Sequence, residues 1–433
     1  MRRLTAPLEP LVAACLTVTV FAFAAGSSIE NRVLLHARTY RWVCLFVLLG
    51  LALVYAVATW TRRRLPWTFL SLAAGLVVLA LVSAAWSADA WLTLRRAGSF
   101  AVLLAIAAAF LAATQVGARR LLMGLLAGAV AVGVAGLGTL AFDYDAAVQP
   151  ASTQYPVRFQ GFEQNPDTAA LLYALAIPIA AYLLLSARTL LARLGLGAAL
   201  LLFVGSTAAS GSRGPMLGAL AGTLVVVLTA PRGTRTRLVL AGVTVVVFAA
   251  CFGISRIPQA RPAPPAAPGT PAIRRTLFTS SGRSAAWSGA IHQAEERPVA
   301  GYGFGTEALV FVDRYAAFES DLVENTYIGT ALQLGIAGFV VLLAVAAAAL
   351  GPFARAPSGG LEAACAGVAV AALAVAVTQS YLLSVGNLAT ATAWINLFLL
   401  AGLGAARSAA AQPVATASSE SMPSRETAGS HSG

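Results

Sequence analysis

The chain alternates long apolar runs with short polar connections over most of its length. About twelve of these runs approach or exceed the roughly 20 residues that a helix needs to cross the hydrocarbon core of a bilayer. They lie near residues 8–27, 42–60, 67–86, 98–116, 121–142, 168–186, 190–209, 215–230, 238–255, 325–351, 361–384 and 387–406. The pattern predicts an all-α polytopic membrane protein with about twelve transmembrane helices.

The composition supports this fold class and excludes a soluble globular protein. Of the 433 residues, 58% are hydrophobic and only 11% are charged, and the mean hydropathy is +0.78. The net charge of +12 would suit nucleic acid or acidic lipid as a partner. All 29 basic residues are arginine, however, and an arginine-only, alanine-rich chain is better explained by genome base composition. We expect membrane lipids as a partner, and no nucleic acid.

The cysteines and the N-terminal segment add no cofactor site and no processing signal. Cys15, Cys44, Cys251 and Cys365 lie singly inside apolar runs, which indicates packing residues rather than a disulfide framework or a metal site. We therefore expect no metal and no cofactor. The first apolar run resembles a signal peptide, but its length and its many apolar successors favour a retained first helix.

The placement of arginine predicts an orientation. Short loops that alternate along the chain carry Arg62, Arg63 and Arg64, then Arg119 and Arg120, Arg188 and Arg193, and Arg232, Arg235 and Arg237. The positive-inside rule assigns these loops to the cytoplasm, which puts residues 256–324 outside. Two outer loops run against the rule, because one carries Arg32, Arg38 and Arg41 and the other carries Arg95 and Arg96.

This orientation divides the chain into four parts. Residues 1–255 form a membrane domain of about nine helices, and residues 325–406 form another of about three. Residues 256–324 form one large extracytoplasmic loop. Residues 407–433, rich in Ser, Ala and Thr, are expected to be a disordered cytoplasmic tail.

The large loop itself has two sections. Six prolines between Pro258 and Pro271 cannot pack a core and predict an extended tether. An amphipathic helix over the membrane face is predicted at residues 283–296, and GYGFG at 301–305 follows as a break. The apolar side of that helix would carry Trp287, Ala290, Ile291 and Ala294.

Three polar segments at the predicted outer face carry the candidate chemistry, because charged groups close to hydrocarbon are costly and usually mark a working site. The first is RFQGFEQNPD at 158–167. Its Arg158 is a candidate ligand for an anionic substrate, or else an interfacial arginine that reaches lipid headgroups. Its Asn165 stands before Pro166, which is also typical of a helix start capped by Asn165.

The second segment is the tight turn SGSRGP at 210–215. It joins two apolar runs and places Arg213 beside the start of the next helix. A guanidinium at a helix N-terminus is suited to a phosphate group. The alternative is that Arg213 only anchors the turn at the interface.

The third segment is DLVENTY at 321–327, where the tenth apolar run begins. Glu324 could cap that helix. Partial burial would instead raise its basicity toward the range of a general base. His292 is the only histidine of the large loop and lies on the polar side of the predicted helix, which is typical of a solvated residue rather than a base.

Several motifs together resemble the bacterial O-antigen ligase and O-antigen polymerase superfamily of membrane glycosyltransferases. The matching features are WSADAW at 86–91, RFQGF followed by Asn165, SGSRG at 210–214, SGR with Trp287, GYGFG, and NTYIGTALQLGIAG at 325–338. The resemblance implies a C-type glycosyltransferase fold with about twelve spans and a large periplasmic loop before the tenth. It also implies a glycan donor on undecaprenyl pyrophosphate and no metal requirement.

The resemblance also implies roles for single residues. Arg158 and Arg213 would grip the pyrophosphate, with assistance from Arg283. Asn165, Asn325 and Tyr327 lie in the matching motifs and are expected to contribute to substrate binding. Members of the superfamily commonly carry a histidine base immediately before the Asn-Thr/Ser-Tyr string, whereas Glu324 occupies that position here.

The expected reaction is an inverting transfer of a glycan to a hydroxyl acceptor at the outer face of the bacterial inner membrane, with Glu324 as the base. The residues leave open whether the protein is a ligase or a polymerase, and which sugar and acceptor it uses. A transporter or flippase for an anionic lipid-linked glycan or solute is the alternative, because interrupted helices can also place polar groups in a transport path. A second alternative is that the protein is a non-catalytic assembly partner.

Overall fold

The computed structural model describes residues 2–27, 36–59, 65–113, 115–150, 157–254, 283–311, 320 and 322–411. Helices make up most of this part of the chain. The long apolar helices are α1 (Arg2–Gly26), α2 (Ala37–Thr59), α3 (Trp67–Val82), α4 (Ala90–Ala109), α5 (Gln115–Phe142), α7 (Pro166–Ser186), α8 (Leu190–Ala209), α9 (Arg213–Leu228), α10 (Thr234–Ile254), α13 (Thr326–Arg355), α14 (Leu361–Val375) and α15 (Leu388–Ala411). The short elements are the 3-10 turns η1 (Ser83–Ala85) and η2 (Phe110–Ala112), the helices α6 (Tyr144–Ala147), α11 (Arg283–Glu295) and α12 (Glu307–Val310), and the strands β1 (Val148–Gln149) and β2 (Arg158–Phe159).

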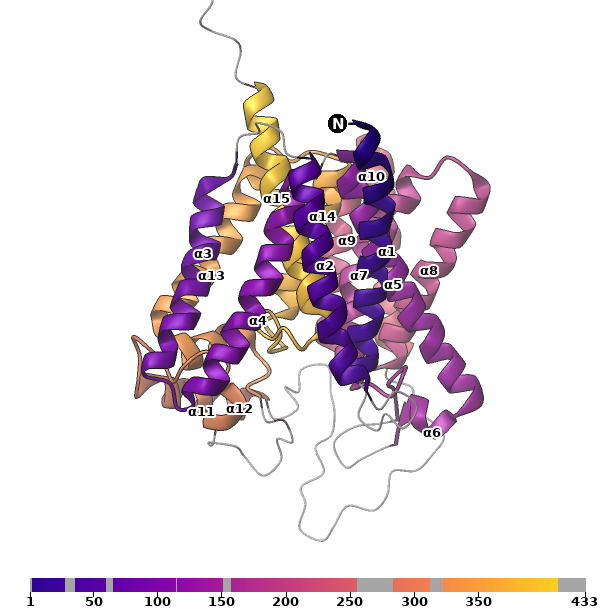
Figure 1. Cartoon of the computed structure of the whole chain (residues 1–433). Helices are drawn as coiled ribbons and strands as arrows, with labels where there is room; N and C mark the ends of the chain where they lie inside the picture. Colours follow the sequence, from indigo (N-terminus) through magenta and orange to yellow (C-terminus); the bar gives the residue numbers. More distant parts are fainter. Residues whose placement is uncertain are drawn as a thin grey trace, which may run out of the picture.

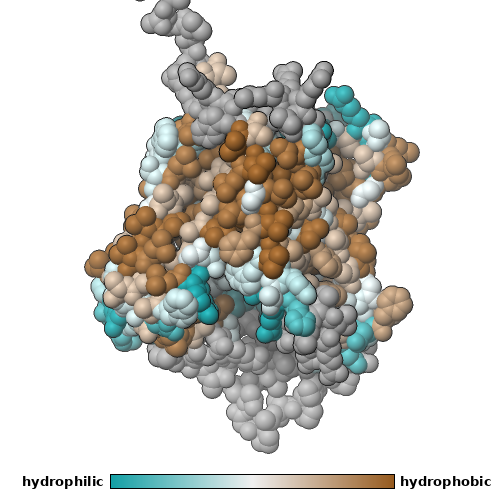
Figure 2. All heavy atoms as spheres, in the orientation of Figure 1, coloured by the Kyte–Doolittle hydropathy of each residue, from teal (hydrophilic) through white to brown (hydrophobic). Residues whose placement is uncertain are grey.

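Each of the twelve predicted apolar runs corresponds to one apolar helix, which confirms an all-α polytopic membrane protein. Among the described residues, ten helices are long and apolar enough to cross a membrane, while α9 and α14 are apolar but shorter. On the face seen in Figure 2, hydrophobic residues cover the middle of the molecule, and hydrophilic residues gather mainly below them. The apolar side chains of Val57 on α2 and of Leu191 and Leu201 on α8 are 77–81% exposed. They would face lipid.

The interior of the bundle is built around α7, α9, α14 and α15, whose residues are mostly buried. Close approach of α9 and α14 depends on glycine. A Cβ on Gly222 would lie 2.3 Å from the carbonyl oxygen of Gly367, and one on Gly367 would lie 2.6 Å from that of Gly222. Small residues therefore let these two backbones touch, as is common between helices in membranes.

The two ends of the bundle differ in their polar groups. At one end, which we call the site end, lie α6, α11 and α12 (Figure 1). The N-terminus and the end of α15 lie together at the opposite end (Figure 1). Two arginines at the opposite end pair with glutamates: Arg120 with Glu9, and Arg407 with Glu362 at 2.7 Å.

The division of the chain into four parts stays a prediction, and the structure describes only some of the segments that it concerns. Helix α11 matches the helix predicted at 283–296, but the prediction of its apolar side was partly wrong: Ile291 is 47% exposed. The buried side instead carries Ala286, Gly289, Ala290 and Gln293. Helix α15 continues to Ala411, past the predicted start of the tail at Arg407. The proline-rich tether, the rest of the tail and Arg62–Arg64 lie outside the described residues.

Candidate active site

Helix α13 breaks near its start, and the GYGFG segment pairs with the break. Gly335 has φ 64° and ψ −166°, which interrupts the helical hydrogen bonds. The backbone N–H groups of Tyr302 and Gly303 donate to the carbonyl oxygens of Leu332 and Gln333, at 3.0 and 2.8 Å. A Cβ on Gly301 would lie 2.5 Å from the Gln333 carbonyl, so only glycine fits there. The GYGFG segment and the start of α13, which are separate in the sequence, are therefore joined by backbone hydrogen bonds.

The WSADAW motif, which leads into α4, bonds the GYGFG segment and the residue before it. The indole N–H of Trp86 donates to the carbonyl oxygen of Ala300 at 3.0 Å, and the backbone N–H of Ala88 donates to that of Tyr302 at 3.0 Å. The carboxylate of Asp89 accepts from the backbone N–H of Leu92 at 2.9 Å and caps α4. The segment before α4 thus holds the loop that precedes α12 in a fixed position.

Glu324 lies in a short segment whose backbone is held on both sides. The N–H of Val323 donates to Oε1 of Glu307 at 2.8 Å, and its carbonyl oxygen accepts from the indole N–H of Trp287 at 3.0 Å. After Glu324, the N–H of Asn325 donates to Oγ of Ser380 at 3.1 Å. These bonds hold Glu324 at φ 56°, a left-handed conformation that costs of the order of 1–3 kcal/mol for a residue other than glycine.

The capping alternative for Glu324 is wrong, because Asn325 is the cap of α13. Oδ1 of Asn325 accepts from the backbone N–H groups of Tyr327 and Ile328, at 2.9 and 3.1 Å. The carboxylate of Glu324 instead accepts from Oγ of Ser320 at 2.9 Å. Its side chain is therefore not consumed by helix capping.

The surroundings of Glu324 favour its neutral form more than water does. Burial raises the pKa of Glu324 to about 7, against a lowering by the positive charge of Arg283. The negative charges of Asp167 and Glu307 raise it further. A carboxyl with this pKa exchanges a proton in the range that imidazole serves elsewhere.

Next to Glu324 lies a group of polar side chains that we call the arginine–aspartate cluster: Arg158, Asp167, Ser212 and Arg283. Nη2 of Arg158 lies 2.6 Å from Oδ1 of Asp167 and 3.0 Å from Oγ of Ser212, and its Nε donates to the carbonyl oxygen of Ser210 at 2.7 Å. Oγ of Ser212 donates to the same Asp167 oxygen at 2.6 Å. The side chain of Arg158 is only 3% exposed, so the expectation that it reaches lipid headgroups is wrong.

Arg283 reaches the cluster from the large loop. As the first residue of α11, it places Nη2 4.0 Å from Oδ2 of Asp167. Its Nε is buried and has no hydrogen-bond partner among the described residues. Asp167 thus lies between guanidinium groups from β2 and α11, two elements more than a hundred residues apart in the sequence, and it hydrogen-bonds the first of them.

The remaining predicted site residues lie around this cluster. Arg213 is the first residue of α9, directly after Ser212, and is partly buried. Oδ1 of Asn165 caps α7 by accepting from the N–H of Asp167 at 2.9 Å, as the sequence predicts. The hydroxyl of Tyr327 donates to the carbonyl oxygen of Leu373 at 2.8 Å. Since the side chains of Asn165, Asn325 and Tyr327 already bond the protein, substrate contacts from them stay a prediction.

His292 is a solvated residue, as expected. Its side chain is 79% exposed, and Nδ1 lies 3.7 Å from a carboxylate oxygen of Glu295. Among the described residues, no group of three or more His, Cys, Asp and Glu side chains could hold a metal ion.

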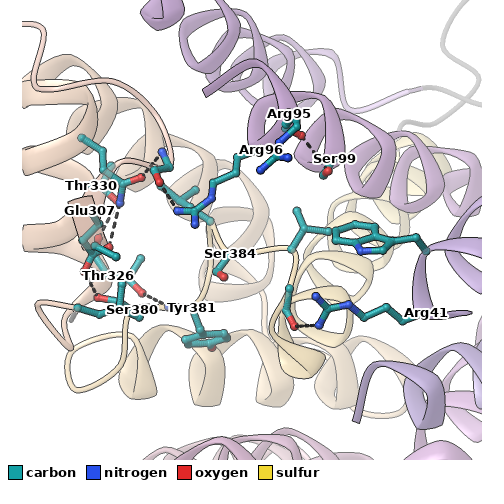
Figure 3. A pocket seen from close by; sticks show the side chains of 18 residues that line it. Arg41, Arg95, Arg96, Ser99, Glu307, Thr326, Thr330, Ser380, Tyr381 and Ser384 are labelled. Carbon is teal, nitrogen blue, oxygen red and sulfur yellow. Dashed lines mark hydrogen bonds between the residues drawn. The ribbon is translucent and has the colours of Figure 1, made fainter. Parts of the chain in front are cut away.

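A cavity of about 620 Å³ borders the segment that carries Glu324. Leu322 and Thr326, two residues before and after Glu324, both line it. In Figure 3, Glu307, Thr326, Thr330 and Ser380 gather on one wall, Arg41 lies on the opposite one, and Arg95 and Arg96 come from α4 between them. We call it the arginine cavity.

Sequence reasoning missed several residues of this site. Asp167 and Ser212 stand beside predicted residues, and their role follows only from the contact between α7 and the turn before α9. Glu307 accepts from Val323, Ser380 and Gln333, and burial raises the pKa of its carboxyl. The sequence did contain one signal for the cavity: three of the arginines that run against the positive-inside rule line it.

The comparison with protein families gives one match. A family model described as O-antigen ligase matches residues 197–343. This segment runs from α8 to the part of α13 after Gly335, and it contains Arg213, Arg283, Glu307 and Glu324. Arg158, Asp167 and the arginines of the cavity lie outside it. No curated protein matches the chain.

Proposed function

We propose that the protein is a membrane glycosyltransferase that moves a glycan from an undecaprenyl-pyrophosphate donor to a hydroxyl acceptor, because a family model described as O-antigen ligase matches residues 197–343. The observation that carries the proposal is the position of Glu324. A carboxyl with a pKa of about 7 is under the charge of the Arg283 guanidinium, which can bind an anionic leaving group. This pairing of a base with an anion site is what transfer from a pyrophosphate-linked sugar requires.

The donor pyrophosphate would bind at the arginine–aspartate cluster. Arg283 has a buried Nε that bonds no described residue, and Arg213 stands at the N-terminus of α9, where backbone N–H groups and the helix dipole favour an anion. Arg158 is fixed by Asp167 and Ser212 and would keep its orientation during the reaction. As the bond between the anomeric carbon and the pyrophosphate oxygen breaks, these positive charges would stabilise the leaving group without a divalent ion.

Glu324 would act as the general base. Its carboxylate takes the proton of the acceptor hydroxyl while that oxygen attacks the anomeric carbon from the face opposite the pyrophosphate. One bond forms and one breaks at the same carbon, so the anomeric configuration inverts. The proton ends on Glu324, and the electron pair leaves with the undecaprenyl pyrophosphate. A base with a pKa near the working pH is the most effective for such a transfer.

The site end would face the outside of the inner membrane. Arg119, Arg120, Arg188, Arg193 and Arg232 lie in the first turns of α5 and α8 or in the connections beside α8 and α10, at the opposite end of the bundle, and the positive-inside rule assigns that end to the cytoplasm. A reaction on this side has no access to ATP, and the activated donor would supply the free energy. Glycan transfer is favoured over transport because the candidate groups gather at one end of the bundle and the family match covers Glu324.

Reconstitution into proteoliposomes tests this function. The purified protein is given lipid-linked glycans from the cells that carry it, together with a membrane extract as the source of acceptors. Loss of glycan from undecaprenyl pyrophosphate without a divalent cation is expected. Products conjugated to another acceptor would identify a ligase, and longer lipid-linked chains a polymerase. Glycan that changes leaflet but stays on its lipid would contradict the proposal and identify a transporter; empty liposomes are the control.

A further inference from the structure

The arginine cavity holds more positive charge than the surrounding protein balances. Among the described residues, Arg41, Arg95 and Arg96 form no ion pair with a carboxylate within 4.0 Å. Glu307 is the acidic residue in the lining, and burial favours its neutral form by raising its pKa. A cavity lined by three arginines and a single carboxyl is suited to an anion.

The guanidinium groups themselves have donors to spare. Arg41 donates from Nη1 to the carbonyl oxygens of Gly26 and Gly386, at 3.3 and 3.5 Å, while its buried Nε has no partner among the described residues. Arg96 donates to the carbonyl oxygen of Gly305. The side chain of Arg95 makes no hydrogen bond or ion pair with the described part of the chain. A guanidinium has five N–H donors, so most of them remain for a ligand.

The location of the cavity points to a ligand that is anchored in lipid. Arg41 lies in the second turn of α2, next to Tyr40 and Val43, which are 61% and 54% exposed. On α4, Trp91 is 69% exposed and lies one turn before Arg95. The arginines therefore stand where outward-facing apolar side chains give way to the polar site end. An acyl or isoprenyl chain could lie along α2 and α4 while its anionic group enters the cavity.

We propose that the arginine cavity binds the phosphate or pyrophosphate group of the acceptor, a second lipid-anchored substrate, while the donor pyrophosphate lies at the arginine–aspartate cluster. The inference rests on the proposed function. Glu324 separates the two anion sites, because Leu322 and Thr326 on either side of it line the cavity and Arg283 acts on it from the cluster. A base in this place receives a proton from one substrate as the other releases its pyrophosphate.

The size of the cavity agrees with this assignment. About 620 Å³ falls inside the range of roughly 300–1,000 Å³ that is usual for small-molecule sites. It accommodates a phosphorylated sugar headgroup but not a long glycan, which would have to extend out of the site end. The hydroxyl groups of Ser384, Thr330 and Ser99 in the lining can bond sugar hydroxyls.

Counting anion sites tests the inference directly. Farnesyl pyrophosphate is titrated by calorimetry into the full-length protein in nanodiscs of neutral phosphatidylcholine, and two sites are expected. Arg95→Gln should weaken one site by about tenfold or more, the loss typical of a hydrogen bond to a charged group. Arg158→Gln should weaken the other site alone. A single site that Arg95→Gln leaves unchanged overturns the inference.

Three controls sharpen the result. Arg38→Gln removes an exposed arginine of α2 that does not line the cavity, and both sites should persist. Arg95→Lys keeps the charge and should bind within about threefold of the wild type, which separates loss of a ligand contact from loss of folding. Nanodiscs with phosphatidylglycerol distinguish the sources of phosphate: disappearance of the Arg95-dependent site there assigns the cavity to bulk lipid headgroups and contradicts an acceptor site.

The same variants in the transfer assay separate this inference from the proposed function. Arg95→Gln should raise the KM for the acceptor about tenfold, with the KM for the donor unchanged. If the wild-type protein binds two pyrophosphates but transfers no glycan, the proposed function fails while the second anion site stands. If it transfers glycan and Arg95→Gln changes only the KM for the donor, the acceptor assignment fails.

Discussion

The arginine–aspartate cluster and the arginine cavity both lie close to the segment that carries Glu324 but are built in different ways. In the cluster, the guanidinium of Arg158 is buried and bonded to a carboxylate, a hydroxyl and a carbonyl oxygen. In the cavity, the arginines bond at most backbone carbonyl oxygens among the described residues. The cluster thus holds Arg158 rigidly, whereas Arg95 in the cavity, whose side chain bonds no described residue, stays adjustable.

The difference fits two different tasks. Charge that develops in a transition state is best stabilised by groups that are already oriented, because they need not reorganise during the reaction. A site that only binds a headgroup gains little from such rigidity and can accept ligands that vary. Asp167 and Ser212 supply the orientation in the cluster. In the cavity, no carboxylate of the described residues lies within 4.0 Å of an arginine nitrogen.

Replacing Glu324, which stands between the two regions, should have the largest effect. Glu324→Gln keeps the size of the side chain but cannot accept a proton, so turnover should fall by the 10²–10⁴-fold, roughly, that general-base catalysis contributes. Glu324→His should restore part of the loss, because imidazole titrates in the same range. Both are measured as kcat in the reconstituted transfer assay, together with the folded yield.

The matched control is Glu295→Gln, the same change at a side chain that is 71% exposed. It should leave turnover unchanged. A fully active Glu324→Gln protein would remove Glu324 from the mechanism, and the two anion sites would then need another base between them.

Exchanging arginine for lysine sharpens the comparison with a smaller effect. Arg158→Lys retains the charge but cannot bond Ser210, Asp167 and Ser212 together, so turnover should fall by about ten- to a hundredfold. Arg95→Lys in the cavity should stay within about threefold, because charge alone suffices there. Equal losses in the two variants, at equal folded yield, would contradict the difference between rigid and adjustable cations.

The fold was largely predictable from the sequence because hydrophobic length is a local property. Each apolar run became a helix, including α9 and α14, which lack full membrane length. The N-cap of α7 was also predictable, since Asn165 and Pro166 carry a local signal. The break of α13 was not: Gly335 leaves the helical conformation because the GYGFG segment supplies partners for the freed carbonyl oxygens, and that pairing is tertiary.

The candidate site was predictable only in part, for the same reason. Arg158, Arg283 and Glu324 were identified from motifs, but the carboxylate that organises the two arginines came from the contact of three separate elements. The sequence left two alternatives for Glu324, and the decision rested on one neighbour, because Asn325 took the capping role. Arg41, Arg95 and Arg96 first appeared as exceptions to an orientation rule, and only the cavity joined them.

The smallest expected effect is a pair of opposite shifts in pH dependence. A base works when it is deprotonated, and Glu324 has a pKa of about 7, so kcat should fall as the pH drops through about 7. Asp167 raises this pKa and Arg283 lowers it. Asp167→Asn should therefore move the acidic limb of the kcat profile to lower pH, and Arg283→Gln should move it to higher pH.

A structural disturbance of the cluster would lower the maximal rate in both variants. Only a change of charge near Glu324 would shift the acidic limb of one variant to lower pH and that of the other to higher pH. Profiles recorded between about pH 5 and pH 9 for the two variants and for Glu295→Gln decide the matter. Limbs that coincide in all three proteins would mean that the titrating base is not Glu324.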